Sequence, residues 1–210
     1  MNNYFIILAS GQSKRFNSNK PKQFNIYKNK ALFKHSIEKA IKSKLFKKII
    51  LVVNNKKNVK EILPKNVLII KGGKERSDSS LIALNYIKKF RPNNVLIHDA
   101  ARPNFSLRLF SSIIKSMKNN RAVIPKINIE DAVKQKFESG QYEYIIGKNR
   151  DNLFLTQTPQ SFNLKEIYYL HKNNSFKYKD DDISLYMNLE KVRFIKGEKN
   201  NFKITDRSDF

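Results

Sequence analysis

A loop of small and basic residues follows the first apolar run of the sequence, and its composition suits a phosphate group. Small residues let the backbone approach a phosphate closely and donate N–H hydrogen bonds, while basic residues supply positive charge. The small residues are Ala9, Ser10 and Gly11, and the basic residues are Lys14, Arg15 and Lys22. The loop matches neither the Walker pattern nor the glycine pattern of dinucleotide-binding proteins. On these residues alone, a nucleotide phosphate site and a solvated basic loop are equal alternatives.

A second cluster runs from Gly72 to Ser79, between a strand-like run and a helical pattern. Its paired glycines permit a tight turn. Ser77 or Asp78 is equally suited to cap the following helix, because both side chains accept hydrogen bonds from backbone N–H groups. The cluster therefore predicts either a second nucleotide-binding loop or an ordinary helix start.

The third cluster, from His98 to Pro103, ends another apolar run. Asp99 and Arg102 place an acid and a base at the end of a buried strand, and the two alanines between them leave open space. A single histidine is more often packed or hydrogen-bonded than bound to a metal, and we expect this of His98. Because the chain has no cysteine and only three histidines, a structural zinc site is not expected.

Apolar runs of strand length alternate with amphipathic segments of helix length. The runs are rich in Ile, Val and Leu without polar alternation, which is typical of strands buried on both faces of a parallel sheet. They predict strands at Tyr4–Ala9, Lys48–Val53, Val67–Ile70, Val95–His98 and Ala122–Pro125, and helices at Ala31–Ser43, Asp78–Phe90 and Leu107–Met117. This alternation predicts a βαβ sheet, whose ligands bind outside the carboxyl ends of the strands.

The pattern changes after Pro125. Extended stretches at 126–137 and 141–146 join across a turn at 138–140 and predict a hairpin arm over about 126–150. The arm has few residues that could build a core, so we expect a partner subunit to cover it and the protein to be a homodimer. The remaining predicted elements are a helix at Leu164–Asn173, a short helix after Asp182, and strands at Val192–Lys196 and Phe202–Thr205.

The charge of the chain is strongly positive, with 42 Lys and Arg against 18 Asp and Glu over 210 residues, a formal net charge of +24. Such an excess is typical of proteins with polyanionic partners. The lysines are spread along the whole chain without a basic block of stacking aromatics, so the pattern does not favour nucleic acid. The length suits one domain. Without a membrane-spanning apolar stretch or a secretory segment, we expect a soluble, cytoplasmic protein.

Taken together, five segments resemble the 2-C-methyl-D-erythritol 4-phosphate cytidylyltransferases of the non-mevalonate isoprenoid pathway, in order and with matching spacing. The segments are Ala9–Phe24, Gly72–Ser79, His98–Pro103, Gln157–Gln160 and Asn201–Thr205. The resemblance covers essentially the whole chain. It implies a single Rossmann-like, three-layer α/β/α nucleotidyltransferase domain over 1–210, with a mostly parallel sheet and a β-hairpin dimerisation arm. It also implies transfer of CMP from CTP to methylerythritol phosphate with release of pyrophosphate, and Mg²⁺ held mainly by the CTP phosphates.

The resemblance also implies roles for individual residues. Those matching the family's catalytic cations are Arg15, Lys22 and Lys203. Those matching its nucleotide site are Ala9, Ser10, Gly11, Gly73, Lys74 and Ser79. Those matching its acceptor site are Asp99, Arg102, Arg150, Thr158 and Lys203, with Arg150 reaching a neighbouring subunit's site. Fixed cations stabilise the charge of an in-line displacement, which needs no nucleophilic side chain.

The sequence departs from the family pattern at four positions. Ser13 stands in place of a second glycine, and Lys74 in place of a common acidic residue. Ala132 and Asp180 replace threonines on the acceptor side. Loss of a hydroxyl-to-phosphate bond costs on the order of 1.5 to 3 kcal/mol in binding.

Three alternatives stay open at this point. A ribitol-phosphate cytidylyltransferase shares the fold and most motifs, although Ala100, Ala101 and the segment 131–134 favour the isoprenoid enzyme. A non-catalytic, basic nucleotide- or RNA-binding module on the same fold is the second. The third is a longer protein, because the resemblance predicts a closing helix after Phe210 and allows a cyclase domain to follow it.

Overall fold

The computed structural model describes residues 2–13, 16, 20–59, 62–139, 142–173, 180–186 and 189–210. The helices are α1 (Leu32–Ser43), α2 (Arg76–Ile87), α3 (Leu107–Ser116) and α4 (Leu164–Asn173). The strands are β1 (Asn3–Ala9), β2 (Ile26–Tyr27), β3 (Lys30–Ala31), β4 (Lys48–Val53), β5 (Val67–Lys71), β6 (Asn94–Asp99), β7 (Ala122–Asn128), β8 (Val133–Ser139), β9 (Tyr142–Lys148), β10 (Phe154–Thr156), β11 (Gln160–Asn163) and β12 (Val192–Lys196). Short 3₁₀ helices include Lys22–Phe24 and Ile183–Leu185.

The central sheet has the strand order β10-β7-β11-β6-β1-β4-β5, with β12 also paired to β7. β1 lies between β4 and β6 and is parallel to both, and β5 is parallel to β4. β11 runs antiparallel to both of its neighbours, β6 and β7. All five strands predicted from the apolar runs are present, and the sheet is mostly parallel, as those runs indicate.

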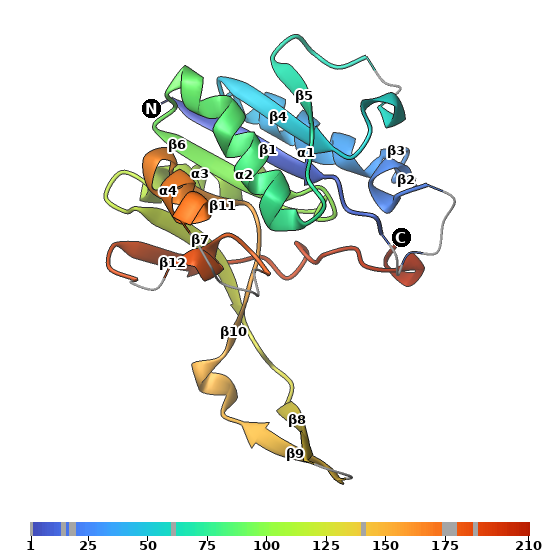
Figure 1. The fold of residues 1–210 in the computed structure, drawn as a ribbon, viewed down its shortest axis with the longest axis vertical. Helices are drawn as coiled ribbons and strands as arrows, with labels where there is room; N and C mark the ends of the chain where they lie inside the picture. The colour runs from blue at the N-terminus through green and yellow to red at the C-terminus, as the bar shows by residue number, and fades with distance from the viewer. Residues whose placement is uncertain are drawn as a thin grey trace.

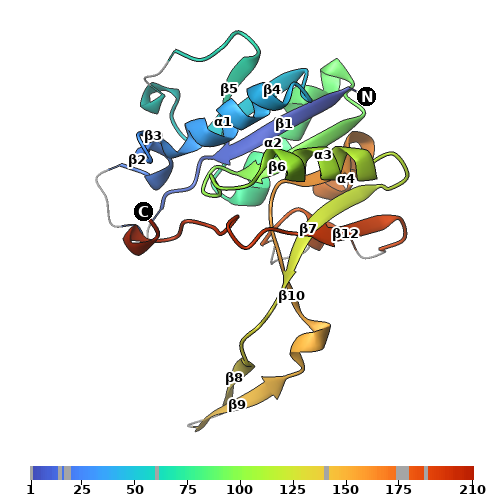
Figure 2. The same cartoon turned by 180° about the vertical axis from the view of Figure 1, so that it is seen from behind.

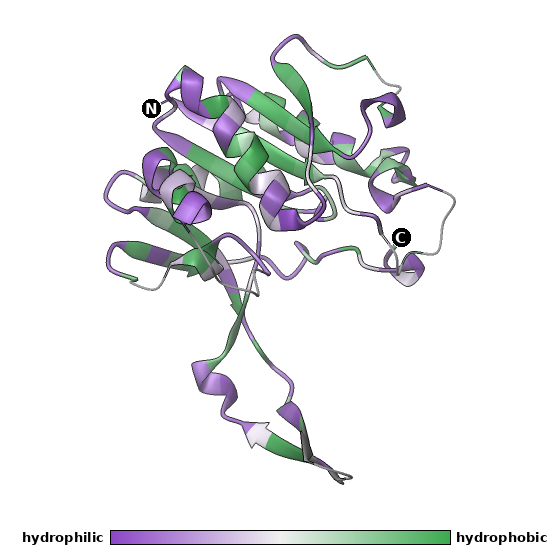
Figure 3. Cartoon of the chain, viewed as in Figure 1, coloured by the Kyte–Doolittle hydropathy of each residue, from purple (hydrophilic) through white to green (hydrophobic). Residues whose placement is uncertain are grey.

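Alternate residues of β1 point into two separate cores. Phe5 and Ile7 pack with α1 and α3, whereas Tyr4 and Ile6 pack with α2 and α4. Figure 1 shows α2 and α4 in front of the sheet, and Figure 2 shows α1 and α3 on the opposite face. The strands are largely apolar, and the helices turn polar residues outward (Figure 3). The chain therefore has the expected α/β/α layers, which leave the carboxyl ends of the parallel strands open at one edge.

Helix α2 begins at Arg76 rather than at Asp78. Neither Ser77 nor Asp78 is its N-cap, so that part of the prediction is wrong. The N-cap is Glu75, and Asp78 at the third helical position accepts a hydrogen bond from the Glu75 N–H, with 3.1 Å between nitrogen and oxygen. The acidic side chain thus faces back to the cap, as in a capping box.

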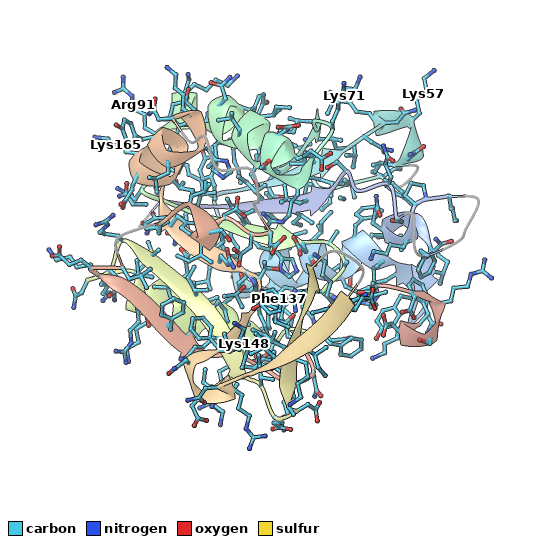
Figure 4. The ribbon with its side chains drawn as sticks, turned by 60° about the horizontal axis from the view of Figure 1, so that its bottom comes forward. Lys57, Lys71, Arg91, Phe137, Lys148 and Lys165 are labelled. Carbon is cyan, nitrogen blue, oxygen red and sulfur yellow. The ribbon has the colours of Figure 1, made fainter. Side chains whose placement is uncertain are left out.

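The hairpin arm begins later than predicted. Residues 126–128 belong to β7 and pair with β10 and β12 in the central sheet. The arm itself is β8 and β9, paired from Val133 with Lys148 onwards, and it extends away from the body of the molecule (Figure 1). Figure 4 views the molecule with this arm towards the reader, and the Lys148 Nζ lies 5.8 Å from the centre of the Phe137 ring. Ile145 is 65% exposed on the arm.

The C-terminal part of the chain differs from the prediction in three places. Residues 202–205 form no strand, although the Ile204 N–H donates to the Ala101 carbonyl at 2.8 Å. β10 and β11 are strands that the apolar pattern did not predict. β11 contains Gln160, Ser161 and Asn163, so its burial inside the sheet follows from pairing with β6 and β7 and not from its own composition.

Candidate active site

A cavity of about 270 Å³ lies at the carboxyl ends of β1 and β6. These neighbouring parallel strands end side by side, with Leu8 opposite Asp99. The cavity walls come from the loop after β1, the 3₁₀ helix at 22–24, the turn before α2, the end of β6 and residues 203–205. The three sequence clusters therefore meet at one edge of the sheet.

The loop after β1 is held in shape by the buried amide of Gln23. Its Nε2 donates to the carbonyl oxygens of Ala9 at 2.7 Å and Gly11 at 2.9 Å. Ser13 has a positive φ of 56°, and its hydroxyl donates to Gln23 Oε1 and accepts from the Lys22 N–H, each at 3.1 Å. Ser13 thus adopts a conformation that favours glycine, and its side-chain hydrogen bonds hold the loop there.

The turn before α2 is tied to the first loop by two hydroxyl groups. Ser79 is fully buried. Its Oγ accepts from the Gly73 N–H at 3.1 Å, donates to the Glu75 carbonyl at 3.1 Å and lies 2.8 Å from Ser10 Oγ. A Cβ on Gly72 would lie 2.7 Å from Ser79 Oγ and 2.8 Å from the Cβ of Ser10 in the first loop. Glycine is therefore required here by close approach of the two loops.

Asp99 is the central charge of the cavity wall. Its Oδ1 lies 3.1 Å from Arg76 Nε, and its Oδ2 lies 2.8 Å from Lys203 Nζ. Burial alone would raise the pKa of Asp99, but the two cations hold it well below its ordinary value. The carboxylate is therefore ionised and bound on both oxygens.

Arg76 in turn lies between two carboxylates. Its Nη1 is 2.7 Å from Asp182 Oδ2, and the other oxygen of Asp182 is 2.9 Å from His171 Nε2. Burial would lower the pKa of Arg76, but Asp182 and Asp99 raise it above its ordinary value. Burial raises the pKa of Asp182, but Arg76 and His171 together lower it to about 2. The pair behind the cavity is ionised.

His98 is a buried, neutral support for the end of β6. Burial lowers its pKa to about 3. Its Nε2 lies 3.1 Å from the Arg102 carbonyl, which only accepts, so Nε2 carries the proton and Nδ1 accepts from the Thr158 hydroxyl at 2.9 Å. Thr158 Oγ1 also accepts from the Asp99 N–H at 3.0 Å. The expectation that His98 is hydrogen-bonded is confirmed.

Residues 201–205 cross the carboxyl edge of the sheet and carry Lys203 to the cavity. Asn201 Nδ2 donates to the Thr158 carbonyl at 2.9 Å, and the Ile204 carbonyl accepts from Lys22 Nζ. The chain then ends beside β2 and β3 (Figures 1 and 2), where Phe210 contacts the Phe16 ring at a centroid distance of 4.9 Å. The last residues are thus anchored on both sides of Lys203.

Comparison with known proteins assigns the arrangement to a family. The family model described as "IspD: 2-C-methyl-D-erythritol 4-phosphate cytidylyltransferase" matches residues 4–210. The chain belongs to the IspD family. It is 48% identical, over its whole length, to the bifunctional enzyme IspD/IspF of Pelagibacter ubique, and spans 56% of that relative.

The single-activity relatives are matched almost end to end. The 2-C-methyl-D-erythritol 4-phosphate cytidylyltransferase of Thermosipho melanesiensis is 33% identical over 99% of this chain and 94% of its own length. The crystal structure of the Francisella tularensis IspD superposes with a TM-score of 0.82 at 27% identity, covering 100% of this chain and 96% of that one. The chain therefore spans about half of the bifunctional relative and nearly all of an IspD protein.

The structure brings seven of the predicted site residues to the wall of this IspD-family cavity. They are Ala9, Ser10, Gly11, Lys22, Lys74, Asp99 and Lys203. Arg15 lies outside the described residues. The residues that match the family's nucleotide loops and the matching cations Lys22 and Lys203 therefore share one space.

The other predicted residues lie behind the wall or away from it. Gly73, Ser79 and Thr158 support the wall from behind, through the hydrogen bonds described above. Arg102 turns to the Asn201 carbonyl, with 2.8 Å between Nη1 and oxygen. Arg150 is exposed at the base of the arm, where its Nη1 donates to the Glu130 carbonyl.

Sequence reasoning missed four residues that build this site. Gln23 shapes the first loop, Thr205 lines the cavity, Arg76 binds Asp99, and Asp182 binds Arg76. Gln23 and Arg76 stand inside motifs that were recognised, so their polarity within those motifs was an available signal. The sequence contained no such signal for Asp182, because only the packing of α2 and α4 brings Arg76 next to it.

The described residues do not form a metal cage. Among them, no group of three or more His, Cys, Asp or Glu side chains is placed to hold a metal ion. Asp99 already has a cation on each carboxylate oxygen.

Among the residues that the structure describes, no helix is both long and apolar enough to span a membrane.

Proposed function

We propose that this chain transfers CMP from CTP to 2-C-methyl-D-erythritol 4-phosphate, giving 4-diphosphocytidyl-2-C-methyl-D-erythritol and pyrophosphate for isoprenoid precursor synthesis. The observation that carries the proposal is the placement of Lys22 and Lys203 in one cavity with the backbone of the loop after β1. A cavity lined by both cations and small residues suits a triphosphate. Membership of the IspD family supplies the reaction that such a cavity would serve.

In the proposed reaction, a phosphate oxygen of the acceptor attacks the α-phosphorus of CTP. A bond forms between that oxygen and phosphorus, and the bond from phosphorus to the bridging oxygen of the β-phosphate breaks, so pyrophosphate leaves with the electron pair. Arg15, Lys22 and Lys203 would stabilise the charge on the non-bridging oxygens. No side chain becomes covalently attached, and none of the roles requires a nucleophile.

We propose that CTP lies against the loop after β1 and the turn before α2. The backbone of Ala9, Ser10 and Gly11 would contact the phosphates, and Gly73, Lys74 and Ser79 would border the nucleoside. Two hydrogen bonds of the Ser79 hydroxyl support this arrangement: it accepts from the Gly73 N–H, and its bond with the Ser10 hydroxyl joins the two loops into one surface. A divalent cation, Mg²⁺, would enter as part of the CTP complex, since the described residues offer no cage for it.

We propose that the acceptor lies on the Asp99 side of the cavity. Asp99 would accept hydrogen bonds from its hydroxyl groups, Lys203 would contact its phosphate, and Thr158 would act by holding the Asp99 backbone. Arg102 lies next to this region, with its guanidinium on the Asn201 carbonyl. Turning this side chain to the acceptor phosphate would break that single hydrogen bond.

Arg150 has a different place, and it connects the site with the arm. It lies on a hollow formed with Lys126, Glu130 and Phe154, apart from the cavity of its own chain. We therefore propose a homodimer in which the arm of each subunit brings Arg150 to the acceptor side of the other. The exposed apolar side chains of the arm and its base, such as Ile145 at 65% and Leu155 at 52%, would be covered in that dimer.

A pyrophosphate assay tests the proposed function. The protein is incubated with CTP and Mg²⁺, and with 2-C-methyl-D-erythritol 4-phosphate or ribitol 5-phosphate in parallel reactions. We expect release with the first acceptor at least about tenfold faster than with the second, in line with a difference of about 1.4 kcal/mol or more. Faster release with ribitol 5-phosphate would identify the alternative cytidylyltransferase, and no release with either would leave a non-catalytic binding module.

A further inference from the structure

A line of paired polar and charged side chains connects the buried interior with the cavity wall. It starts at His171 on α4 and passes through Asp182, Arg76 and Asp99 to Lys203, with each neighbouring pair separated by 2.7 to 3.1 Å. Four segments that are far apart in sequence contribute to it. The line therefore forms only when the whole body is folded.

The inner end of this line is buried, and its outer end is the most exposed. The side chains of Asp182 and His171 are 0% and 2% exposed, whereas that of Lys203 is 43% exposed. Asp182 and His171 do not reach the cavity, so they cannot contact a ligand there. Their effect on a ligand must pass through Arg76 and Asp99.

Arg76 is suited to transmit such an effect because its guanidinium is planar and rigid. Its Nε donates a hydrogen bond to Asp99 and its Nη1 forms an ion pair with Asp182, so the two carboxylates hold the guanidinium from two sides. Without the charge of Asp182, one of these two restraints is lost. Asp99 would then bind a mobile cation, and Lys203 would bind a less firmly placed carboxylate.

We propose that Asp182, held by His171, is a positioning residue for the transfer reaction, which acts through Arg76 and Asp99 to fix the ammonium group of Lys203 at the cavity. The inference rests on the proposed function for its kinetic readout. The inference adds to that function a buried residue, Asp182, that does not line the cavity. It also gives Arg76 the role of connecting Asp182 with Asp99.

Asp182→Asn tests this role, because it removes the charge and keeps the size of the side chain. We expect kcat to fall about tenfold, with the KM for CTP unchanged within about twofold, as for loss of an interaction made in the transition state. The matched control is Glu166→Gln, which breaks the ion pair of Glu166 with Arg121 at the start of α4, outside the cavity. We expect normal kcat in this control.

A double-mutant cycle separates positioning from a general structural effect. In a Lys203→Ala background, Asp182→Asn should lower kcat by less than about twofold, because the group on which it acts is gone. Equal losses of kcat in the two backgrounds would overturn the proposal. If Asp182→Asn does not fold, His171→Gln provides the same cycle, with a smaller loss expected in the presence of Lys203 and none in its absence.

Failure of the inference and failure of the proposed function give different results. Wild-type protein that releases no pyrophosphate with CTP and either acceptor contradicts the proposed function alone. Calorimetry with pyrophosphate as the probe then tests the positioning role directly. Weaker binding after Asp182→Asn in the presence of Lys203, and unchanged binding in the Lys203→Ala background, would support it; the same change in both backgrounds would overturn it.

Discussion

At the scale of single residues, Lys22 shows how the site is prepared before a ligand binds. Its backbone N–H is bound by the Ser13 hydroxyl, and its ammonium group donates to the Ile204 carbonyl. The side chain is therefore directed across the cavity towards the segment that carries Lys203. A cation that is already in place stabilises developing charge without the cost of reorganising it during the reaction.

Lys22→Ala should lower kcat by about 10²-fold or more, because it removes a preorganised charge stabiliser. The measurement is steady-state pyrophosphate release at saturating CTP and acceptor. Lys20→Ala is the matched control, since Lys20 is an exposed lysine close in sequence that does not line the cavity. Turnover within about twofold of the wild type in both variants would contradict the role of Lys22.

His98 should make the folded state sensitive to acid. Burial lowers its pKa to about 3, against about 6.5 when exposed. Between these values the unfolded chain binds a proton that the folded chain does not, so the contribution of His98 is complete above pH about 6.5 and is lost as the pH falls towards 3.

Urea unfolding between pH 7 and pH 5 measures this contribution. We expect the free energy of unfolding of the wild type to fall by up to about 1.4 kcal/mol per pH unit more steeply than that of His98→Gln. Parallel curves for the two proteins would show that His98 is not buried in its neutral form.

At the scale of elements, the sequence predicted the parallel half of the sheet because β1, β4, β5 and β6 are buried on both faces and carry continuous apolar runs. It did not predict β11, whose polar residues Gln160 and Ser161 are buried by the neighbouring strands. It placed a strand at 202–205, where the segment instead bonds to single groups of the Ala101 and Lys22 regions. The local sequence pattern predicts the elements that bury their own apolar side chains. It does not predict elements whose burial or conformation depends on residues distant in sequence.

The same distinction applies to the site. Small residues and cations at strand ends were visible in the sequence, because parallel strands bring their carboxyl ends together. The pairing of Arg76 with Asp182 was not visible in the sequence, because it depends on how α2 and α4 pack. Arg150 was visible as a residue, and the resemblance had already implied that it serves a neighbouring subunit's site.

The turn before α2 makes a prediction at this scale. A Cβ on Gly73 would lie 2.4 Å from the Asp78 Cβ, whereas a Cβ on Gly11 meets nothing within 4 Å. Gly73→Ala should therefore displace the start of α2 and destabilise the fold by about 1 to 3 kcal/mol. Gly11→Ala should leave stability within about 0.5 kcal/mol of the wild type. Equal melting temperatures for wild type and Gly73→Ala would contradict this packing.

At the scale of the whole molecule, positive charge is spread over many elements, whereas exposed apolar residues gather on the arm. Figure 4 shows Arg91 and Lys165 together at one upper corner of the body and Lys57 and Lys71 at the other, all pointing outward. They are solvated cations from different elements, in keeping with a net charge of +24 that is spread along the sequence. The arm, in contrast, concentrates exposed apolar residues in one projection.

Mixing two inactive variants tests the proposed dimer. Lys22→Ala removes a cation from a subunit's own cavity, and Arg150→Ala removes one from the arm. If each site takes Lys22 from one subunit and Arg150 from the other, half of the randomly mixed dimers carry one intact site, which restores about a quarter of wild-type activity. No recovery after denaturation and joint refolding, with each variant refolded alone as the control, would contradict the shared site.

We propose that CMP passes directly between two phosphates in the cavity formed by the loop after β1 and residues 203–205. Phosphorus NMR of a reaction with CTP, Mg²⁺ and 2-C-methyl-D-erythritol 4-phosphate tests it most directly. We expect equal amounts of pyrophosphate and of a product with two coupled diphosphate signals, and neither of them when the acceptor is omitted. Release of CMP without the diphosphate product, or unchanged spectra, would contradict it.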